Sequence, residues 1–496
     1  MFNLSLKLLL LTSFLASGLV YGTENKDCDS LKFRERTLTK IGYAPTNIGI
    51  TNISSFCSYK NWISSQLNNP NFYNDDLIES KFTNLISHNK NNLEITHLYN
   101  QDEENFGTKL RKEAEYRRIT YALYSENRLR EMMVWFWFNH FNIYGNDGNV
   151  VYFKSYEDIF RNNPFGNFKD ILLQVTTHPS MLTYLDNDLN NKRMTFKSKK
   201  IGFNDNHARE LFELHSMGVN GGYTEKDIHQ MAKILSGFKS IDKYNQIYEG
   251  SKKSYQKKYE SAFLNLRNKN DLMAFSKKNK QLNIDKVYDH FGIYSHKFHD
   301  TSDKIILNSE IKGSDYKELE QALSIIVEHP STAYFISKKI GFFFLGDEPN
   351  QYLLDSMATT FIKTKGDIKA VLEVLLLDDD FARHIKDNNS FKNPYEFYIS
   401  TSKLTLNGTF YDSQEKIAGY LHNSGFGIYS KITPEGYSLS GTTHLSANTI
   451  SNYINFIYLL NDNSKEALNL DNMNSYYNLS KDEYIKFLIS YNWFYR

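Results

Sequence analysis

The sequence predicts a mainly α-helical protein, an irregular multi-helix array of stacked helical hairpins with few short strands. Only eight prolines interrupt the 496 residues. Long stretches carry apolar residues at the 3.6-residue spacing of amphipathic helices, whereas few segments alternate as half-buried strands do. A pattern of apolar helix, polar corner and further apolar helix occurs three times. Together these observations favour helices packed on helices.

Residues 1–22 have the composition of a secretory signal peptide. Lys7 supplies the positive charge, and an apolar run of about 14 residues follows from Leu8 to Tyr21. That run is shorter than the ~20 residues that a bilayer-spanning helix needs. We therefore expect an exported protein, periplasmic or secreted, whose mature chain of residues 23–496 is helical and does not span the membrane.

The two cysteines, Cys28 and Cys57, both lie near the start of the expected mature chain. In an oxidising compartment they are most simply interpreted as one disulfide. The bridge would close a loop of about 30 residues and stabilise the fold by roughly 3 kcal/mol.

The charges are balanced. Lys and Arg number 58 and Asp and Glu 57, and removal of Lys7 with the signal peptide brings the formal charge from +1 to about 0. Such a chain has no overall attraction to nucleic acid or anionic lipid, so a nucleic-acid partner is not expected.

The helical elements have recognisable ends. Residues 109–138 predict one long helix. The threefold pattern then predicts helical hairpins, with His178 and His329 as helix caps at two corners, each before a proline at the first helical position. The repeats are the following segments: 168–181, 319–333 and 367–382.

A helix–loop–helix unit occupies the middle of the chain. A helix capped by Asp205 or Asn206 runs to Met217, where Gly218 ends it. Thr224 caps the next helix, with Asp227 three residues on in a capping-box arrangement. The same connection resembles the latter half of a calcium-binding loop, but its first ligand positions are too poor, so calcium is less expected than a glycine stop followed by a capping box.

Residues 243–290 form a basic insertion. Between Ser251 and Lys280 there are nine basic and two acidic residues, interleaved with aromatic ones. Such a run is either a solvated insertion or a surface that contacts an anionic polymer.

Several ordered motifs resemble the bacterial family DUF1800, a domain of unknown function. The motifs, in chain order, are 41–43, 62–67, the aromatic segment 131–141, 178–187, the sharpest signature Asn204-Asp205-Asn206-His207-Ala208-Arg209-Glu210-Leu211-Phe212-Glu213-Leu214-His215, its continuation 221–227, then 299–304, 329–333 and 364–367. The resemblance implies an exported, predominantly helical protein, and it supplies no established reaction. It also implies a partner, because members are often encoded beside exported proteins of the DUF1501 family.

The chain departs from the family pattern at several positions. Phe238 stands where the family usually has Trp, and Asp205 replaces a usual Glu. Pro434-Glu435-Gly436-Tyr437 is retained near the C-terminus, but His444 and Asn452 stand where a Trp and an Arg are expected. A site that uses those two residues would be altered here.

No established catalytic signature occurs in the sequence, so candidate chemistry depends on polar residues in apolar surroundings. Imidazole and carboxylate side chains suit zinc, iron or manganese. The residues expected to hold such an ion are His140, Glu210, Glu213, His215, His299 and Asp300. Those expected to act in catalysis are Glu210, His215, His140 and Arg209.

The alternative for these residues is a buried structural network. Glu210 and Glu213 would pair with Arg209, Arg128 or Arg130, and the histidines would bond helix ends.

Two functions follow from these interpretations. One is a metal-dependent enzyme of the cell envelope, hydrolytic or oxidative. The other is a non-catalytic envelope protein that binds a partner protein, such as a DUF1501-family protein, or a surface polysaccharide.

Overall fold

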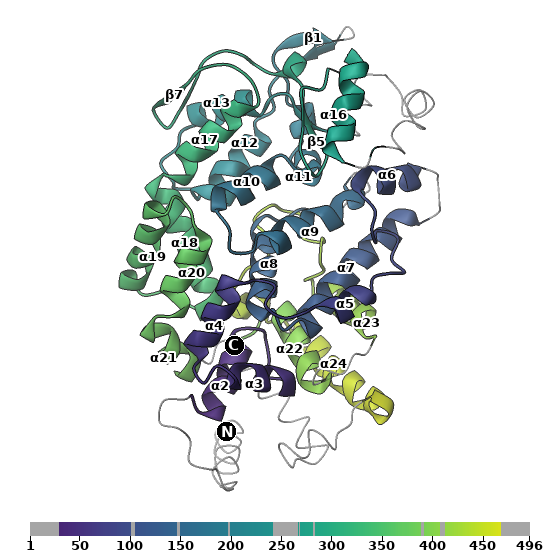
Figure 1. The fold of residues 1–496 in the computed structure, drawn as a ribbon, viewed down its shortest axis with the longest axis vertical. Helices are drawn as coiled ribbons and strands as arrows, with labels where there is room; N and C mark the ends of the chain where they lie inside the picture. Colours follow the sequence, from purple (N-terminus) through teal and green to yellow (C-terminus); the bar gives the residue numbers. More distant parts are fainter. Residues whose placement is uncertain are drawn as a thin grey trace.

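The computed structural model describes residues 29–100, 105–145, 149–196, 199–241, 266, 268–280, 283–387, 391–406 and 412–467. Helices dominate the described ranges, as the sequence predicts (Figure 1). Those of the first third are α2 Leu31–Lys40, α3 Asn47–Ser54, α4 Tyr59–Asn68, α5 Asp76–Ser80, α6 Asn92–Asn100, α7 Phe106–Tyr124, α8 Arg128–His140, η1 Val150–Tyr152 and α9 Phe153–Asn162.

The middle of the chain combines helices with short strands. Its helices are α10 Phe168–Thr176, α11 Pro179–Tyr184, η2 Asn187–Leu189, α12 Asn206–Glu210, η3 Leu211–Ser216, α13 Glu225–Leu235, α16 Lys269–Lys278, η5 His296–Phe298 and α17 Lys317–Val327. The last third is again helical, with α18 Pro330–Leu345, α19 Gln351–Lys363, α20 Ile368–Leu376, α21 Asp379–Asp387, α22 Pro394–Leu406, α23 Gln414–Asn423, η6 Gly441–His444 and α24 Ala447–Ala467.

The strands form three small antiparallel sheets at one end of the molecule. Two are two-stranded, β1 with β2 and β6 with β7; the third has the order β3-β5-β4, with Phe238 opposite Tyr294. The strands are β1 Met194–Phe196, β2 Lys199–Ile201, β3 Phe238–Ser240, β4 Lys286–Val287, β5 Gly292–Tyr294, β6 Lys304–Ile306 and β7 Ser309–Ile311. None exceeds three residues, so the expectation of few short strands is confirmed.

The predicted long helix 109–138 is wrong in one respect, because it is two helices. Helix α7 ends at Tyr124 and α8 begins at Arg128. The Asn127 side chain pairs with the backbone of Tyr73, accepting from its N–H and donating to its carbonyl, both at 2.8 Å. The side chains of Ser and Asn can compete with helical hydrogen bonds in this way. Here the bonds to the distant Tyr73 backbone stabilise the interruption between the two helices.

The predicted hairpin corners are confirmed at His178 and His329. The Nδ1 atom of each imidazole accepts a hydrogen bond from the backbone two residues on, at 3.2 Å, and a proline follows each cap. Two of the repeats also meet each other. Phe168 N–H donates to the carbonyl of Gly366, and Ile368 N–H donates to that of Gly166.

One large apolar core unites the chain. Its buried side chains extend from Leu38 in α2 to Leu460 in α24. A smaller cluster lies around the β3-β5-β4 sheet and includes Leu272 of α16 and Val287 of β4. The latter part of the predicted basic insertion is therefore packed against the protein, while residues 243–265 lie outside the described residues.

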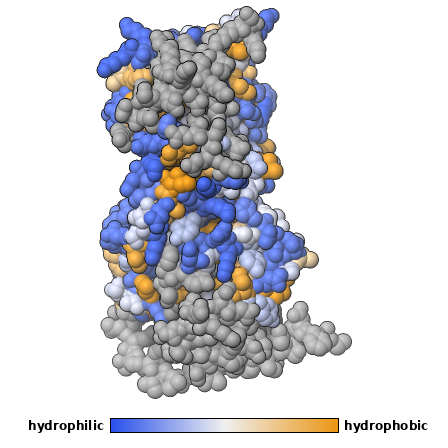
Figure 2. Space-filling model, turned by 90° about the vertical axis from the view of Figure 1, so that its right-hand side faces the viewer, coloured by the Kyte–Doolittle hydropathy of each residue, from blue (hydrophilic) through white to orange (hydrophobic). Residues whose placement is uncertain are grey.

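The molecule is elongated, and Figure 2 shows a constriction between its two ends with hydrophobic residues exposed there. Within the described ranges, no helix combines the length and apolar composition needed to cross a bilayer.

The N-terminal predictions fall mostly outside the described residues. The expected signal peptide 1–22 and Cys28 both lie there. Cys57 is described and is not a free thiol. Its pairing with Cys28 stays a prediction.

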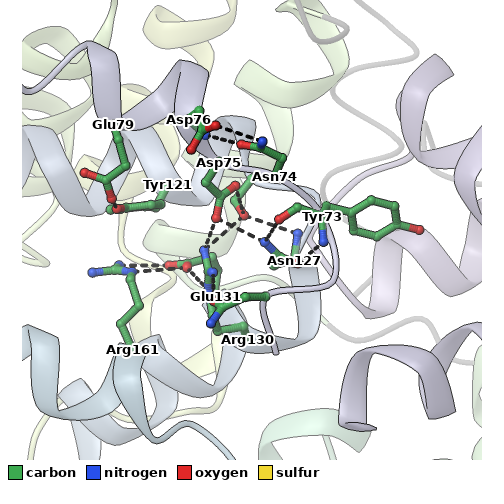
Figure 3. A network of polar contacts seen from close by, with 12 residues as sticks. Tyr73, Asn74, Asp75, Asp76, Glu79, Tyr121, Asn127, Arg130, Glu131 and Arg161 are labelled. Carbon is green, nitrogen blue, oxygen red and sulfur yellow. Dashed lines mark hydrogen bonds and ion pairs between the residues drawn. The ribbon is translucent and has the colours of Figure 1, made fainter. Parts of the chain in front are cut away.

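A buried ionic network joins α8 to its neighbours (Figure 3). The Glu131 carboxylate accepts from Arg130 at 2.7 Å and from Arg161 at 2.9 Å. Arg130 also pairs with Asp75, and Arg161 pairs with Glu157 at 2.6 Å. Burial by itself raises the pKa of Glu131, but the two arginines outweigh this effect and lower the pKa to about 2.

We expect Glu131→Gln to lower the free energy of unfolding at pH 7 by about 3 kcal/mol, because two buried guanidinium groups lose their shared charge partner. A carboxyl group with a lowered pKa stabilises the fold above its unfolded pKa near 4.5. This stabilisation is lost as the pH falls towards 2, so the variant should show less acid sensitivity in that window.

Urea unfolding monitored across this pH range measures both effects. Glu415→Gln is the matched control, because Glu415 pairs with Lys112 on the surface and its loss should leave the free energy of unfolding unchanged. Equal stability of Glu131→Gln and the wild type would contradict a stabilising role for the network.

Candidate functional site

The predicted helix from Asn206 to Met217 changes character midway. It is α-helical to Glu210 and continues as a π-helix, η3, over Leu211–Ser216. Met217 N–H donates to the carbonyl of Phe212 five residues earlier, and the Ser216 hydroxyl donates to that of Leu211. Gly218 ends the segment as predicted, with φ +81° and the ring of Phe335 directly beside it. Short π-helical turns inside helices occur frequently at functional sites.

The π-helix brings His215 to the end of α8, where His140 lies. Nε2 of His140 lies 3.1 Å from the carbonyl oxygen of His215, and the two rings are 6.4 Å apart. A carbonyl can only accept, so Nε2 carries the proton and Nδ1 of His140 is left as an acceptor. Lys339 Nζ, from α18, lies 2.8 Å from this Nδ1 atom and donates to it.

Aromatic rings surround the His140–Lys339 pair. The His140 ring lies parallel to Phe136 and edge-on to Phe141, and Lys339 Nζ lies 5.3 Å from the centre of the Phe335 ring. His140 is 1% exposed. Burial, with smaller contributions from Lys339 and His215, holds the pKa of His140 well below its usual value. Burial also lowers the pKa of Lys339 to about 8.

Glu210 lies on the same helical segment as His215, directly before the π-helix. Within the part of the chain that the structure describes, its carboxylate has no hydrogen-bond or ion-pair partner. Burial raises its pKa, the neighbouring carboxylates of Glu213 and Glu435 add to this increase, and Arg209 partly offsets it. Glu210 is therefore a carboxyl group that holds its proton more readily than usual, which suits a general acid or base.

Arg209 has a structural role. Its guanidinium donates to both oxygens of Glu225, at 2.8 Å each, and lies 3.5 Å from Glu213. The contact fastens α12 to the first turn of α13. The predicted pairing of Glu213 with Arg209 therefore occurs, whereas Arg128 pairs with Glu126 instead.

His299 and Asp300 lie in a different cluster. Nδ1 of His299 lies 2.8 Å from the Ser236 carbonyl, and Nε2 lies 3.2 Å from Glu318, which also pairs with Lys304 at 2.5 Å. Asp300 accepts hydrogen bonds within its own turn. This cluster closes the loop before β6 onto α13 and α17.

The six residues expected to hold a metal ion therefore do not form one centre. No three His, Cys, Asp or Glu side chains among the described residues come together as a metal site. His140 and His215 are brought together, but through a backbone carbonyl. Glu213 is directed to Arg209, and His299 and Asp300 belong to a separate ionic cluster. A zinc, iron or manganese site built from these six residues stays a prediction, and the contacts of the described residues do not support it.

In the loop that resembles a calcium-binding loop, the contacts are those of the expected glycine stop and capping box. Thr224 and Asp227 form the predicted capping box, in which each side chain bonds the other residue's backbone N–H. The second oxygen of Asp227 accepts from Leu307 N–H at 2.8 Å. Both carboxylate oxygens are thus occupied: one closes the capping box with Thr224, and the other joins α13 to the β6–β7 turn.

The retained C-terminal motif 434–437 packs against the end of α8. The Asn139 amide donates to the carbonyl of Tyr437 and accepts from its N–H, at 2.9 and 2.8 Å. A Cβ atom at Gly436 would lie 2.1 Å from the Asn139 carbonyl oxygen, so only glycine permits this approach. The residue beside His140 is thereby held by a segment almost 300 positions away.

His444 and Asn452 stand where the family's Trp and Arg are expected. Among the described residues, neither has a hydrogen bond or ring contact with His140 or Lys339. Nε2 of His444 lies 3.0 Å from the carbonyl of Ser438, and its ring packs edge-on against Phe426.

The comparisons with known proteins agree with the motifs. The model of the family described as a protein of unknown function, DUF1800, matches residues 36–491. The chain belongs to this family. No curated protein and no solved structure is significantly similar to it.

Sequence reasoning missed Lys339. In the sequence it is one of two adjacent lysines, Lys338 and Lys339, on an otherwise apolar helix. Such a lysine is usually solvated, and the only available signal was its place in the apolar stretch 333–345. Lys338 is the ordinary member of the pair, since it is partly exposed and forms an ion pair with Glu348 at 2.8 Å.

We expect Gly436→Ala to destabilise the protein by more than about 1 kcal/mol, because the backbone has φ +75° and the methyl group would strike the Asn139 carbonyl. Thermal unfolding measures the change. Gly419→Ala is the control: Gly419 lies inside α23 with open space around it, so alanine should leave or slightly raise the melting temperature. Equal melting temperatures of the two variants would contradict the close docking of this motif.

Proposed function

We propose that this protein is an exported enzyme of the cell envelope in which Lys339 is the reacting group and His140 is its acid–base partner. The observation that carries the proposal is the 2.8 Å contact between Lys339 Nζ and Nδ1 of a neutral histidine. Export and location in the envelope rest on the signal-like residues 1–22. A DUF1501-family protein or a surface polymer stays a proposed partner.

The amine is unusual in what surrounds it. Within the described residues, no carboxylate forms an ion pair with Lys339. An amine of this kind loses its proton more readily, because neither water nor a counter-charge favours the ammonium form. With a pKa of about 8, roughly a tenth of Lys339 is uncharged at pH 7, far more than for an ordinary lysine.

Lys339 also differs from the other lysines with lowered pKa values. Those side chains are at most 3% exposed and donate to backbone or hydroxyl oxygens as parts of the core, namely Lys239, Lys392 and Lys403. Lys339 is only partly buried. A desolvated amine beside an apolar wall and a proton acceptor is how enzymes prepare a lysine nucleophile.

Glu210 would supply a second proton-transfer group on the same helical segment. Its partnerless carboxyl and the π-helical turn that follows it are features that a purely structural helix does not need. The backbone carbonyl of His215 accepts the hydrogen bond from Nε2–H that fixes the tautomer of His140. Three of the four residues expected from the sequence to act in catalysis, His140, Glu210 and His215, thus keep a role in this proposal.

The test is the reactivity of individual lysines in the folded full-length mature protein. Limited acetylation with acetic anhydride between pH 6 and 10, followed by peptide mass spectrometry, gives a titration curve for each amine. We expect Lys339 to titrate near pH 8 and to react at least tenfold faster than its neighbour Lys338 at pH 7, once each rate is corrected for exposure.

Lys338 is the internal control, because its pairing with Glu348 raises its pKa. Identical titration of the two lysines, both above pH 10, would contradict the enzymatic proposal and favour the non-catalytic binding function.

A further inference from the structure

We infer that the substrate is a small uncharged aldehyde or ketone, which Lys339 binds covalently as a Schiff base. The inference rests on the proposed function and assigns its substrate class. It depends on three features of the site: an amine without a counter-ion, a proton acceptor in contact with it, and an apolar wall.

The amine is placed for attack on an electrophilic carbon. A lysine in an ion pair is held as ammonium and has no free electron pair. Lys339 donates instead to a neutral imidazole nitrogen, so loss of one proton to water releases the electron pair on Nζ. Lys338, one residue away, is held as ammonium by Glu348.

The reaction balances with the groups present. Nζ forms a bond to the carbonyl carbon, and a proton passes from nitrogen through Nδ1 of His140 to the carbonyl oxygen, giving a carbinolamine. A second proton, taken up from water through the same imidazole, lets the hydroxyl group leave as water. The net change converts Lys339 ammonium and a carbonyl compound into an iminium ion and water, with no oxidant or reductant.

His140 is fixed for this shuttle. Its Nε2–H is bonded to the His215 carbonyl, so the ring cannot turn without losing that bond, and Nδ1 stays directed at the amine. The π-helix η3 places this carbonyl. In this respect His215 is a positioning residue that acts through its backbone.

The groups that act on the His140–Lys339 pair include no second cation that would bind an anionic substrate. The titratable groups that act on His140 are Lys339 and His215, and those that act on His215 are His207 and Lys339. Burial, with small contributions from neighbouring groups for His215, lowers the pKa of His207 and of His215 to about 3, so both rings are neutral. No arginine is among these groups to bind a carboxylate or phosphate, and the rings of Phe136, Phe141 and Phe335 favour an apolar molecule.

The experiment is reductive trapping on the wild-type mature protein. The protein is mixed with benzaldehyde at pH 7, and sodium cyanoborohydride reduces any Schiff base to a stable secondary amine. Peptide mass spectrometry locates the added benzyl group. We expect at least tenfold more adduct on Lys339 than on Lys338, and tenfold less with pyruvate, an anionic carbonyl compound, at the same concentration.

Variants then separate the roles. Lys339→Arg should abolish the major adduct, whereas Lys338→Arg, the matched change one residue away, should leave it. His140→Gln should slow trapping at Lys339 at least tenfold, and circular dichroism establishes that each variant is folded. The ratio of adducts on Lys339 and Lys338 is measured in the wild-type protein. The proposal is therefore tested even if a variant does not fold.

The outcomes distinguish the two proposals. Rapid acetylation of Lys339 without carbonyl trapping would overturn the substrate class and leave the reactive lysine standing. Trapping no greater than at Lys338, together with ordinary acetylation, would overturn both. Stronger trapping of pyruvate than of benzaldehyde would overturn the preference for an uncharged substrate.

Discussion

The carboxylate of Glu131 is the constraint on which the centre of the molecule depends. It lies between two buried arginines, and each arginine reaches a further carboxylate, so α8, α9 and the segment before α5 are tied to one point. Buried charges of this kind tolerate few alternative arrangements, because any other arrangement leaves a charge unpaired in the core. His140 lies at the far end of the same helix. Its position relative to α9 is therefore fixed by the network.

The features predicted correctly from sequence are local ones. The caps at His178, His329 and Thr224 depend on side chains within three residues of the backbone groups they satisfy, so the chain itself contains the information. The break between α7 and α8 was not foreseen, because the Asn127 amide is satisfied by Tyr73, far away in sequence. The π-helix has the same difficulty: residues 211–216 are compatible with an ordinary helix, and only the packed structure selects the wider turn.

The candidate site was predicted in part for a related reason. Motifs drew attention to His140 and His215, and the structure brings them together. The same reasoning grouped His299 and Asp300 with them because all are potential ligands, although residue type carries no information on distance. Lys339 was missed because its contact with His140 spans 199 positions. Its unusual environment is created by rings from other helices.

The reciprocal bonds between the first and third helical repeats have a consequence for the history of the chain. The N–H of Phe168 donates to the carbonyl of Gly366, and the N–H of Ile368 donates to that of Gly166. Each segment therefore donates one hydrogen bond to the other and accepts one from it. This is the pattern of an isologous contact, the kind by which two copies of one chain associate around a twofold axis. Duplication and fusion of a gene for a self-pairing hairpin would account for both the sequence echo and the exchanged bonds. On that account, the interior of the monomer would preserve a former dimer interface.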